Sequence, residues 1–243
     1  MHHFKLPHRN TGFTLVELAI VLVIVALLSS GLLLGVSAQR NAAENIDAQR
    51  QLENIREALL GYAMANGRLP CPAQANLPNT DDDNAGKALT PPCDGALQHG
   101  VLPWKTLGLP ETDPWGNRFT YFVSSDSNVT PSKSFARALP PGALASFSLD
   151  TPGNANVKDI WNSGANIASE LPAVIVSHGS RSAGAYQPTG VQLPASANLN
   201  EAENSDADTT FVSRTPSDTF DDLVIWIVPS ILKSKMVAAG RLP

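Results

Sequence analysis

The strongest pattern in the chain is an apolar run near its N-terminus. No charged residue lies between Leu18 and Val36, and Ser29 and Ser30 are the only polar side chains in that run. A helix of about 20 apolar residues is long enough to cross the hydrocarbon core of a membrane. We therefore expect residues 13–38 to form a hydrophobic transmembrane helix, and no later segment of the sequence resembles it.

After Val36 the apolar residues repeat with the spacing of a helix. Five of them, at intervals of four, three, four and three, share one face: Ala48, Leu52, Ile55, Leu59 and Tyr62. The charged and amide side chains between them would face water. This pattern predicts that residues 39–66 continue the first helix as an amphipathic segment.

A stop signal ends the amphipathic segment. Asn66 and Gly67 accept left-handed backbone conformations, and a proline follows three residues after the glycine. We expect one helix over residues 13–65, about 80 Å long at 1.5 Å per residue. Its first half suits lipid or a fibre core, and its second half should pack on a globular head formed by residues 67–243.

Three segments of the head have the composition of strands. They are residues 118–124, 173–177 and 222–228. The last is a continuous apolar run, which indicates a buried final strand. Residues 230–239 should then form a short helix that ends at Gly240, with Lys233 and Lys235 exposed.

The remaining parts of the head are rich in Pro, Asn, Asp, Ser and Gly. Residues 67–103 resemble a long loop, and regular structure is weak in residues 125–170, which we interpret as an inserted, exposed region. Trp104 and Trp115 should cover the sheet against the helix. The predicted fold class is α+β, with one long helix packed on a small antiparallel sheet with long loops.

The charge of the chain disfavours nucleic-acid binding. The formal net charge is −5, with 17 basic and 22 acidic residues. Lys5 and Arg9 lie in the first twelve residues, so the chain without them carries −7. No basic stripe is present that would follow a phosphate backbone.

Two cysteines, Cys71 and Cys93, fit neither a C-x-x-C motif nor a zinc pattern. In a head outside the cytoplasm they would form a disulfide, which stabilises a loop of this length by about 3 kcal/mol. A catalytic thiol pair is the alternative, but no flanking positive charge is present to lower a thiol pKa.

The N-terminal sequence TGFTLVEL resembles the signal of type IV pilins and of the pseudopilins of type II secretion. The resemblance lies in the basic leader Met1–Gly12, the aromatic Phe13, Glu17 as the fifth residue after the leader, and the uninterrupted apolar helix. It implies that a membrane prepilin peptidase cleaves between Gly12 and Phe13 and methylates the new amino terminus of Phe13. A second resemblance, over DPWGNRFTYFV at residues 113–123, is to a turn and strand of major pseudopilins.

Glu17 has two interpretations. A carboxylate at the edge of an apolar segment is costly unless it is paired or lies near the headgroups. In a fibre of staggered subunits, Glu17 of one helix would meet the cleaved Phe13 amine of another, and this partly desolvated pair would set the register of assembly. In the alternative, Glu17 lies at the membrane interface or helps the helix start, because acids near a helix N-terminus favour the macrodipole.

Acidic residues crowd two loops of the head, and the turn DDDNAG at residues 81–86 adds a third group. Oxygen ligands of this kind suit calcium, and the resemblance to major pseudopilins implies a calcium site in the later loops. The candidate ligands are Glu201, Asp206, Asp208, Asp221 and Asp222. Solvated acidic loops without a metal are the alternative, and we expect no other cofactor.

The pair Ser177–His178 lies at the end of a predicted strand and invites a hydrolase interpretation. The motif G-x-S-x-G is absent, and no pattern in the sequence places an acid beside the histidine. We therefore interpret His178 as a polar residue at a strand end, and the protein as having no enzymatic activity.

The resemblances imply a structural subunit of a type IV pilus or of a type II secretion pseudopilus. The expected partners are prepilin peptidase, other pilin or pseudopilin subunits and an inner-membrane assembly platform. The chain would cross the bacterial inner membrane once, with its head in the periplasm, before it enters a fibre. The alternative is a membrane-anchored periplasmic binding module or enzyme that is not incorporated in a fibre. A third possibility is a binding module at a fibre tip, which would use the 125–170 loops or aromatic residues.

Overall fold

The computed structural model describes residues 12–125 and 134–243, and for residues 28–38 it describes the backbone without the side chains. The predicted leader therefore lies outside the described residues except for Gly12. The chain divides into two units, with the boundary between Ala43 and Glu44. The first unit holds the N-terminal part of a helix, and the second is the globular head.

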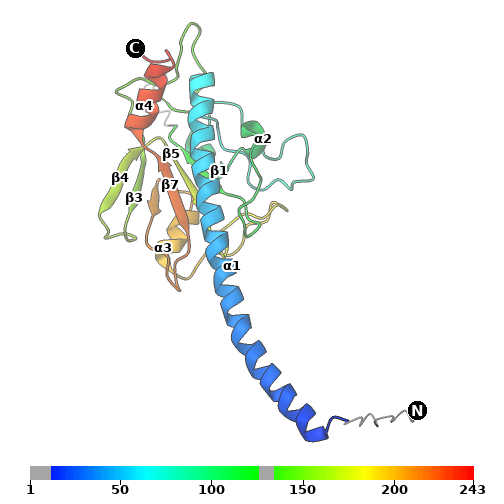
Figure 1. Ribbon diagram of the computed structural model, residues 1–243. Helices are drawn as coiled ribbons and strands as arrows, with labels where there is room; N and C mark the ends of the chain where they lie inside the picture. The colour runs from blue at the N-terminus through cyan, green and yellow to red at the C-terminus, as the bar shows by residue number, and fades with distance from the viewer. Residues whose placement is uncertain (1–11, 126–133) are drawn as a thin grey trace, which may run out of the picture. The chain divides into compact units, whose positions relative to one another are not determined.

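Helix α1, Leu15–Asn66, crosses this boundary (Figure 1). It ends where the sequence predicted, because the backbone N–H of Gly67 donates to Ala63 O at 2.8 Å and Gly67 has φ +70°. A Cβ at this position would lie 2.3 Å from Leu144 O, so both the conformation and the close approach favour glycine. Over the part of the chain that the structure describes, no helix has the length and apolar character needed to cross a membrane.

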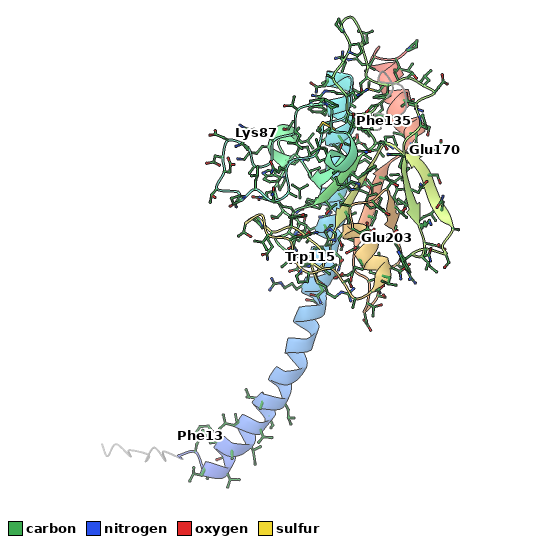
Figure 2. All side chains as sticks on the ribbon, turned by 180° about the vertical axis from the view of Figure 1, so that it is seen from behind. Phe13, Lys87, Trp115, Phe135, Glu170 and Glu203 are labelled. Carbon is green, nitrogen blue, oxygen red and sulfur yellow. A yellow bond between two sulfur atoms is a disulfide. The ribbon has the colours of Figure 1, made fainter. Side chains whose placement is uncertain are left out.

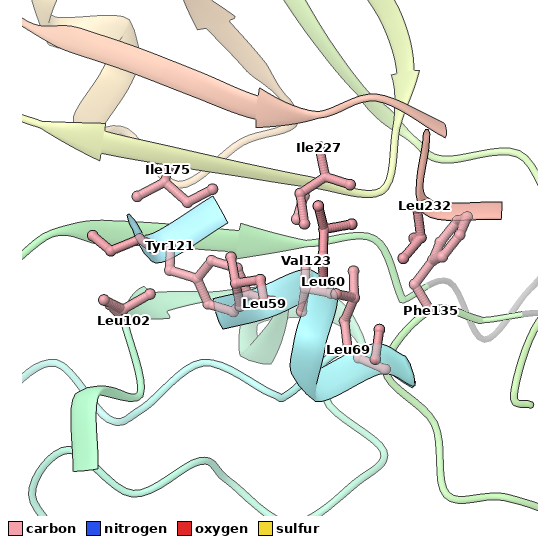
Figure 3. Packing of buried hydrophobic residues seen from close by; sticks show 14 of the residues in the cluster. Leu59, Leu60, Leu69, Leu102, Tyr121, Val123, Phe135, Ile175, Ile227 and Leu232 are labelled. Carbon is pink, nitrogen blue, oxygen red and sulfur yellow. The ribbon is translucent and has the colours of Figure 1, made fainter. Parts of the chain in front are cut away.

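A four-stranded antiparallel sheet forms the centre of the head. Its strands, in spatial order, are β1 (His99–Val101), β2 (Thr120–Val123), β5 (Ala173–Ser177) and β7 (Leu223–Ile227). The part of α1 that belongs to the head packs on one face of this sheet, where Leu59 joins Tyr121, Val123 and Ile175 in the main core (Figure 3). This arrangement confirms the predicted α+β class with a helix and an antiparallel sheet.

A second sheet covers the other face, and the sequence did not predict it. Its order is β4 (Asn166–Leu171), β3 (Ala155–Lys158) and β6 (Thr210–Val212), with β3 antiparallel to β4 and parallel to β6. Phe122, Val174 and Val176 of the first sheet pack against Val157 and Phe211 of the second. The prediction of weak structure over 125–170 missed β3 and β4, whereas residues 134–154 contain no helix or strand and residues 126–133 lie outside the described residues.

Five short helical elements complete the described part of the head. They are η1 (Gly95–Gln98), α2 (Trp104–Leu107), α3 (Leu199–Ala202), η2 (Glu203–Ser205) and the terminal helix α4 (Pro229–Ala238). The predicted long loop over residues 67–103 contains η1 and β1. The predicted terminal helix is confirmed, but Lys233 is half-buried and donates through Nζ to Thr151 O at 2.9 Å. The prediction that Lys233 is exposed was therefore wrong.

Two further predictions about the core need correction. Trp104 does not lie between the sheet and α1, because it belongs to a separate small cluster with Ala73, Ala85 and Val101. Residues 222–228 contain β7, but only Leu223 and Ile227 at the ends of β7 are buried. The middle of this strand is half-buried because β7 is the last strand of its sheet, and no other described strand pairs with its outer edge.

Candidate functional site

Thr14 and Glu17 form a capping box at the start of α1. The backbone N–H and the hydroxyl of Thr14 donate to Glu17 Oε2 at 3.1 and 2.9 Å, and the Glu17 N–H donates to Thr14 Oγ1 at 3.2 Å. Each side chain thus satisfies a backbone donor that the first helical turn leaves unpaired. Within its own chain Glu17 starts the helix, which is one of the two interpretations that the sequence left open.

The first turns of α1 expose apolar side chains on every face. Phe13 and Leu15 are 84% and 88% exposed. Apolar residues that are at least half exposed continue along this segment: Val16, Leu18, Ile20, Val21, Leu22, Val23, Ile24, Val25 and Leu27. A helix that is apolar all round needs a cover of lipid or of other helices. Gly12 and Phe13, the predicted cleavage positions, are exposed at the end of this helix, where Figure 2 labels Phe13.

The predicted disulfide is confirmed. Cys71 and Cys93 are joined, with their Cα atoms 5.8 Å apart, and both are fully buried in the main core. Each sulfur lies near Ala136 O, at 3.6 and 3.5 Å. The bridge therefore fastens the loop of residues 71–93 to the head, and the pairing leaves no free thiol for catalysis.

The DPWGN turn is anchored at both of its sides. Asp113 Oδ1 accepts from the N–H groups of Trp115 and Asn117, each at 3.0 Å, and Oδ2 accepts from Ser177 Oγ at 2.8 Å. Trp115 Nε1 donates to Glu44 Oε2 at 3.1 Å. Burial raises the pKa of Asp113, and these hydrogen bonds oppose the rise. The turn thus connects the end of β5 to the first residue of the head's helix.

A fully buried arginine, which sequence reasoning missed, follows this turn. Arg118 Nε and Nη2 donate to Glu111 Oε1 at 2.9 and 2.8 Å, and the guanidinium lies 4.7 Å from the centre of the Trp104 ring. Its other donors bond three carbonyl oxygens, those of Ala75, Leu77 and Pro188. Five bonds satisfy the guanidinium and fix three loops. No local pattern pointed to this role because the three carbonyl partners lie 41 to 70 positions away in the sequence.

His178 is buried beside an acid that the sequence did not place. Its Nε2 lies 2.8 Å from Thr120 Oγ1, and its Nδ1 lies 3.7 Å from Asp222 Oδ1. The order hydroxyl, imidazole, carboxylate resembles that of a nucleophile, its base and an orienting acid. The distance from Nδ1 to the carboxylate exceeds a hydrogen bond, and neither atom has another partner among the described residues. Both side chains are fully buried, so the cluster links β2, β5 and the start of β7 inside the head.

The structure divides the predicted calcium ligands between two groups. One group is Glu201, Asp221 and Asp222, and the other is Glu203 with Asp206 and Asp208. In the first group Arg181 already supplies a cation, because its guanidinium lies 2.7 Å from Glu201 and 3.3 Å from Asp221. In the described part of the chain the second group forms no ion pair, although the positive charge of Lys158 acts on Glu203. Glu203 takes part in this group although it was not among the predicted ligands. A calcium site in either group stays a prediction.

Glu203 has the most perturbed carboxyl group of the second acidic group. Burial raises its pKa to about 7, and the negative charges of Asp206 and Asp208 contribute to the rise. The earlier acidic turn differs, since Asp81 accepts hydrogen bonds from Asn84 at 3.1 Å and Asp82 pairs with Lys105 at 3.4 Å. The turn is therefore held by its own side chains and by Lys105 of α2.

Comparison with protein-family models gives one match, to the prokaryotic N-terminal methylation motif, over residues 7–33. Searches of the curated proteins and of the solved structures returned no significant match. The matched segment contains Gly12, Phe13, Thr14 and Glu17. It supports a prepilin signal of the type IV pilin and pseudopilin kind, and so confirms the first resemblance seen in the sequence.

Proposed function

We propose that this protein is a structural subunit of a type IV pilus or of a type II secretion pseudopilus. The observation that carries the proposal is the methylation motif at residues 7–33, which includes the start of a helix with apolar side chains on all faces. A prepilin-type signal implies processing by prepilin peptidase and assembly with other subunits. The exposed apolar surface of α1 then becomes the surface through which the helices bundle.

Before assembly, we propose, the chain is anchored in the bacterial inner membrane with its head in the periplasm. The uncharged run from Leu18 to Val36 supports this location, although the side chains of residues 28–36 lie outside the described part of the structure. The disulfide between Cys71 and Cys93 agrees with a head in an oxidising compartment.

Cleavage would give Glu17 its second role. Removal of the leader creates an amine at Phe13, and in a staggered bundle that amine reaches the carboxylate of a neighbouring helix. The capping box holds one oxygen of Glu17 on the donors of Thr14, so the carboxylate is oriented at the very start of the helix. Among apolar helices such a pair is strongly dependent on register.

The head is proposed to act in assembly and not as an enzyme. Its most hydrolase-like arrangement, Thr120–His178–Asp222, has a buried imidazole and a long distance to the carboxylate. Its only two cysteines are closed in a disulfide. These features support a structural role, and not a catalytic one, for His178 and the two cysteines.

Separation of fibres from membranes tests the proposal. In cells that contain prepilin peptidase and the assembly platform, a sheared fibre fraction should contain the head, detected by an antibody to it. In cells without the peptidase, the head should remain in the membrane fraction. A head that stays in the membrane in both strains would instead support the membrane-anchored binding module.

A further inference from the structure

A groove of about 690 Å³ runs along the free edge of β7. Its walls are residues 46–54 of α1 and residues 213–216, which follow β6. The groove touches Leu223, Val224 and Ile225 in succession. Because successive strand residues point to opposite faces, a groove in contact with all three lies along the strand edge and not over one face of the sheet.

The charges in this groove are unbalanced. Arg50 and Arg214 line it, both are exposed, and within the described residues neither has an ion-pair or hydrogen-bond partner. The two acids of the lining are already engaged, since Glu53 pairs with Arg56 and Asp222 accepts from Asn204 at 2.8 Å. The groove thus presents an apolar floor between two unpaired cations, in a chain whose formal net charge is −5. We name it the arginine groove.

The same chain carries a surface of complementary charge. Asp81, Asp82 and Asp83 form its only run of three acids, and Asp82 and Asp83 are exposed. This acidic turn keeps a defined shape because Asp81 accepts from Asn84, and Lys105 Nζ donates to Asp82 O at 3.1 Å. Lys105 offsets one of the three charges, so the turn remains acidic.

The two surfaces lie on different sides of the head. Lys105 belongs to α2, and β7 and α2 lie on opposite sides of the head's helix in Figure 1. In the reverse view, Figure 2 shows Lys87, next to the acidic turn, on the side opposite to Glu170 of β4. Two different patches on opposite sides of one molecule form a head-to-tail contact, and repetition of such a contact generates a helical fibre.

We propose that the arginine groove receives the acidic turn of a second copy of this chain. This inference rests on the proposed function, because the contact repeats only when the helices are bundled. Arg50 and Arg214 pair with the carboxylates of the neighbour's turn, and the apolar floor is covered by the residues beside it. The contact fixes the rotation of adjacent heads, as Glu17 fixes the register of adjacent helices.

Cysteine cross-linking in cells that assemble the fibre tests the contact directly. Gln49→Cys lies in the groove and Asp83→Cys lies in the turn, and the native cysteines are buried in their own disulfide. A chain that carries both substitutions should form a ladder of dimers, trimers and longer species under mild oxidation. Each single variant should remain monomeric, because a head-to-tail contact brings no residue next to its own copy. Symmetric dimers from a single variant would overturn the proposal.

Charge reversal gives an independent readout. Arg50→Glu with Arg214→Glu should remove the head from the fibre fraction or cut its amount strongly, and Asp81→Lys with Asp83→Lys in the same chain should restore it. Lys235→Glu is the control, since Lys235 lies on α4 outside the groove and pairs with the exposed Glu57 at 3.0 Å. No rescue by the reversed turn would contradict the pairing.

The outcomes separate this inference from the proposed function. Fibres that form normally without the cross-linked ladder would remove the head contact and leave the structural-subunit proposal intact. Absence of the protein from every fibre would remove both. In a Glu17→Ala background that blocks incorporation, the ladder of the double-cysteine variant should disappear, and a ladder that persists would mean that the contact forms independently of the fibre.

Discussion

The indole Nε1 of Trp115 donates to the carboxylate Oε2 of Glu44 at 3.1 Å, across 71 positions of the sequence. This bond connects the DPWGN turn to the first residue of the head, because Glu44 is where the compact head begins. The turn is held at its other side by the bond from Ser177 to Asp113. Together the two hydrogen bonds fix the start of the head's helix against the sheet.

This bond should contribute measurably to the stability of the head. Trp115→Phe keeps a ring and removes the donor, and should lower the free energy of unfolding by about 1 kcal/mol. The measurement is denaturant unfolding of the full chain in detergent micelles. A double-mutant cycle with Glu44→Ala should give a coupling energy of about 0.5–1.5 kcal/mol, and strictly additive effects would show that the bond contributes nothing.

Arg118 should be far more sensitive than an exposed arginine. Arg118→Met leaves Glu111 without its partner and three loop carbonyls without a donor, which should cost about 3–5 kcal/mol. Arg214→Met is the matched control on the surface, and should change stability by less than about 0.5 kcal/mol. Equal effects in the two variants would contradict the role assigned to the buried guanidinium.

The disulfide should be a major part of the head's stability. Replacement of both Cys71 and Cys93 by serine should lower the free energy of unfolding by about 2–4 kcal/mol. Reduction of the unaltered protein with a thiol should lower it by a similar amount, which distinguishes loss of the bridge from an effect of the serines. An unchanged unfolding midpoint under reduction would contradict this prediction.

Glu203 should make the head less stable as pH rises. Its pKa is about 7 in the folded state and 4.5 in the reference state, so the folded head binds more protons between these pH values. Stability linked to this group is then fully present below about pH 4.5 and is lost as pH rises through 7. Glu203→Gln should stabilise the head at pH 8, change little at pH 4, and flatten the dependence between them.

The exposed Asp83→Asn serves as the control for that pH series, since it removes a carboxylate outside the Glu203 group. It should leave the shape of the curve unchanged. Thermal midpoints of the two variants and of the unaltered chain, measured from pH 4 to 8, make the comparison. If Glu203→Gln follows the unaltered chain at every pH, the buried carboxyl does not have the raised pKa.

Thr14 separates the two interpretations of Glu17. Both residues take part in the capping box, but only Glu17 supplies a charge for a neighbouring amine. Glu17→Ala should leave membrane insertion intact and strongly reduce incorporation into the fibre fraction. Thr14→Ala removes the cap and keeps the carboxylate, so it should incorporate nearly normally. Equal defects in the two variants would assign Glu17 to helix capping alone.

Local patterns in the sequence predicted a substantial part of the fold. The stop at Asn66 and Gly67, strand β5, helix α4 and the disulfide were all predicted, because each depends on neighbouring residues or on the only available cysteine pair. The second sheet was missed because its strands are short and mix apolar with polar residues, and β4 is largely exposed. In strands this short, the alternation of apolar and polar residues resembles the composition of a loop.

Much of the candidate site could not be predicted from the sequence, because it depends on contacts between residues that are far apart along the chain. Arg118 and its carbonyl partners, and the acid beside His178, come together only through tertiary packing. The N-terminal signal could be recognised because its residues, from the basic leader to Glu17, are neighbours in the sequence. The folding of the loops divides the acidic residues into two groups. It also places Arg181 beside Glu201 in one of them, which the sequence could not predict.

Mass spectrometry of the mature N-terminus shows directly whether the chain is processed as a prepilin. The protein is purified from the membrane and fibre fractions of cells with and without prepilin peptidase, and its first residue and methylation are determined. We predict a chain that begins at N-methylated Phe13 in fibres, and an uncleaved chain when the peptidase is missing. A fibre-associated chain that still begins at Met1 would contradict assembly after prepilin processing.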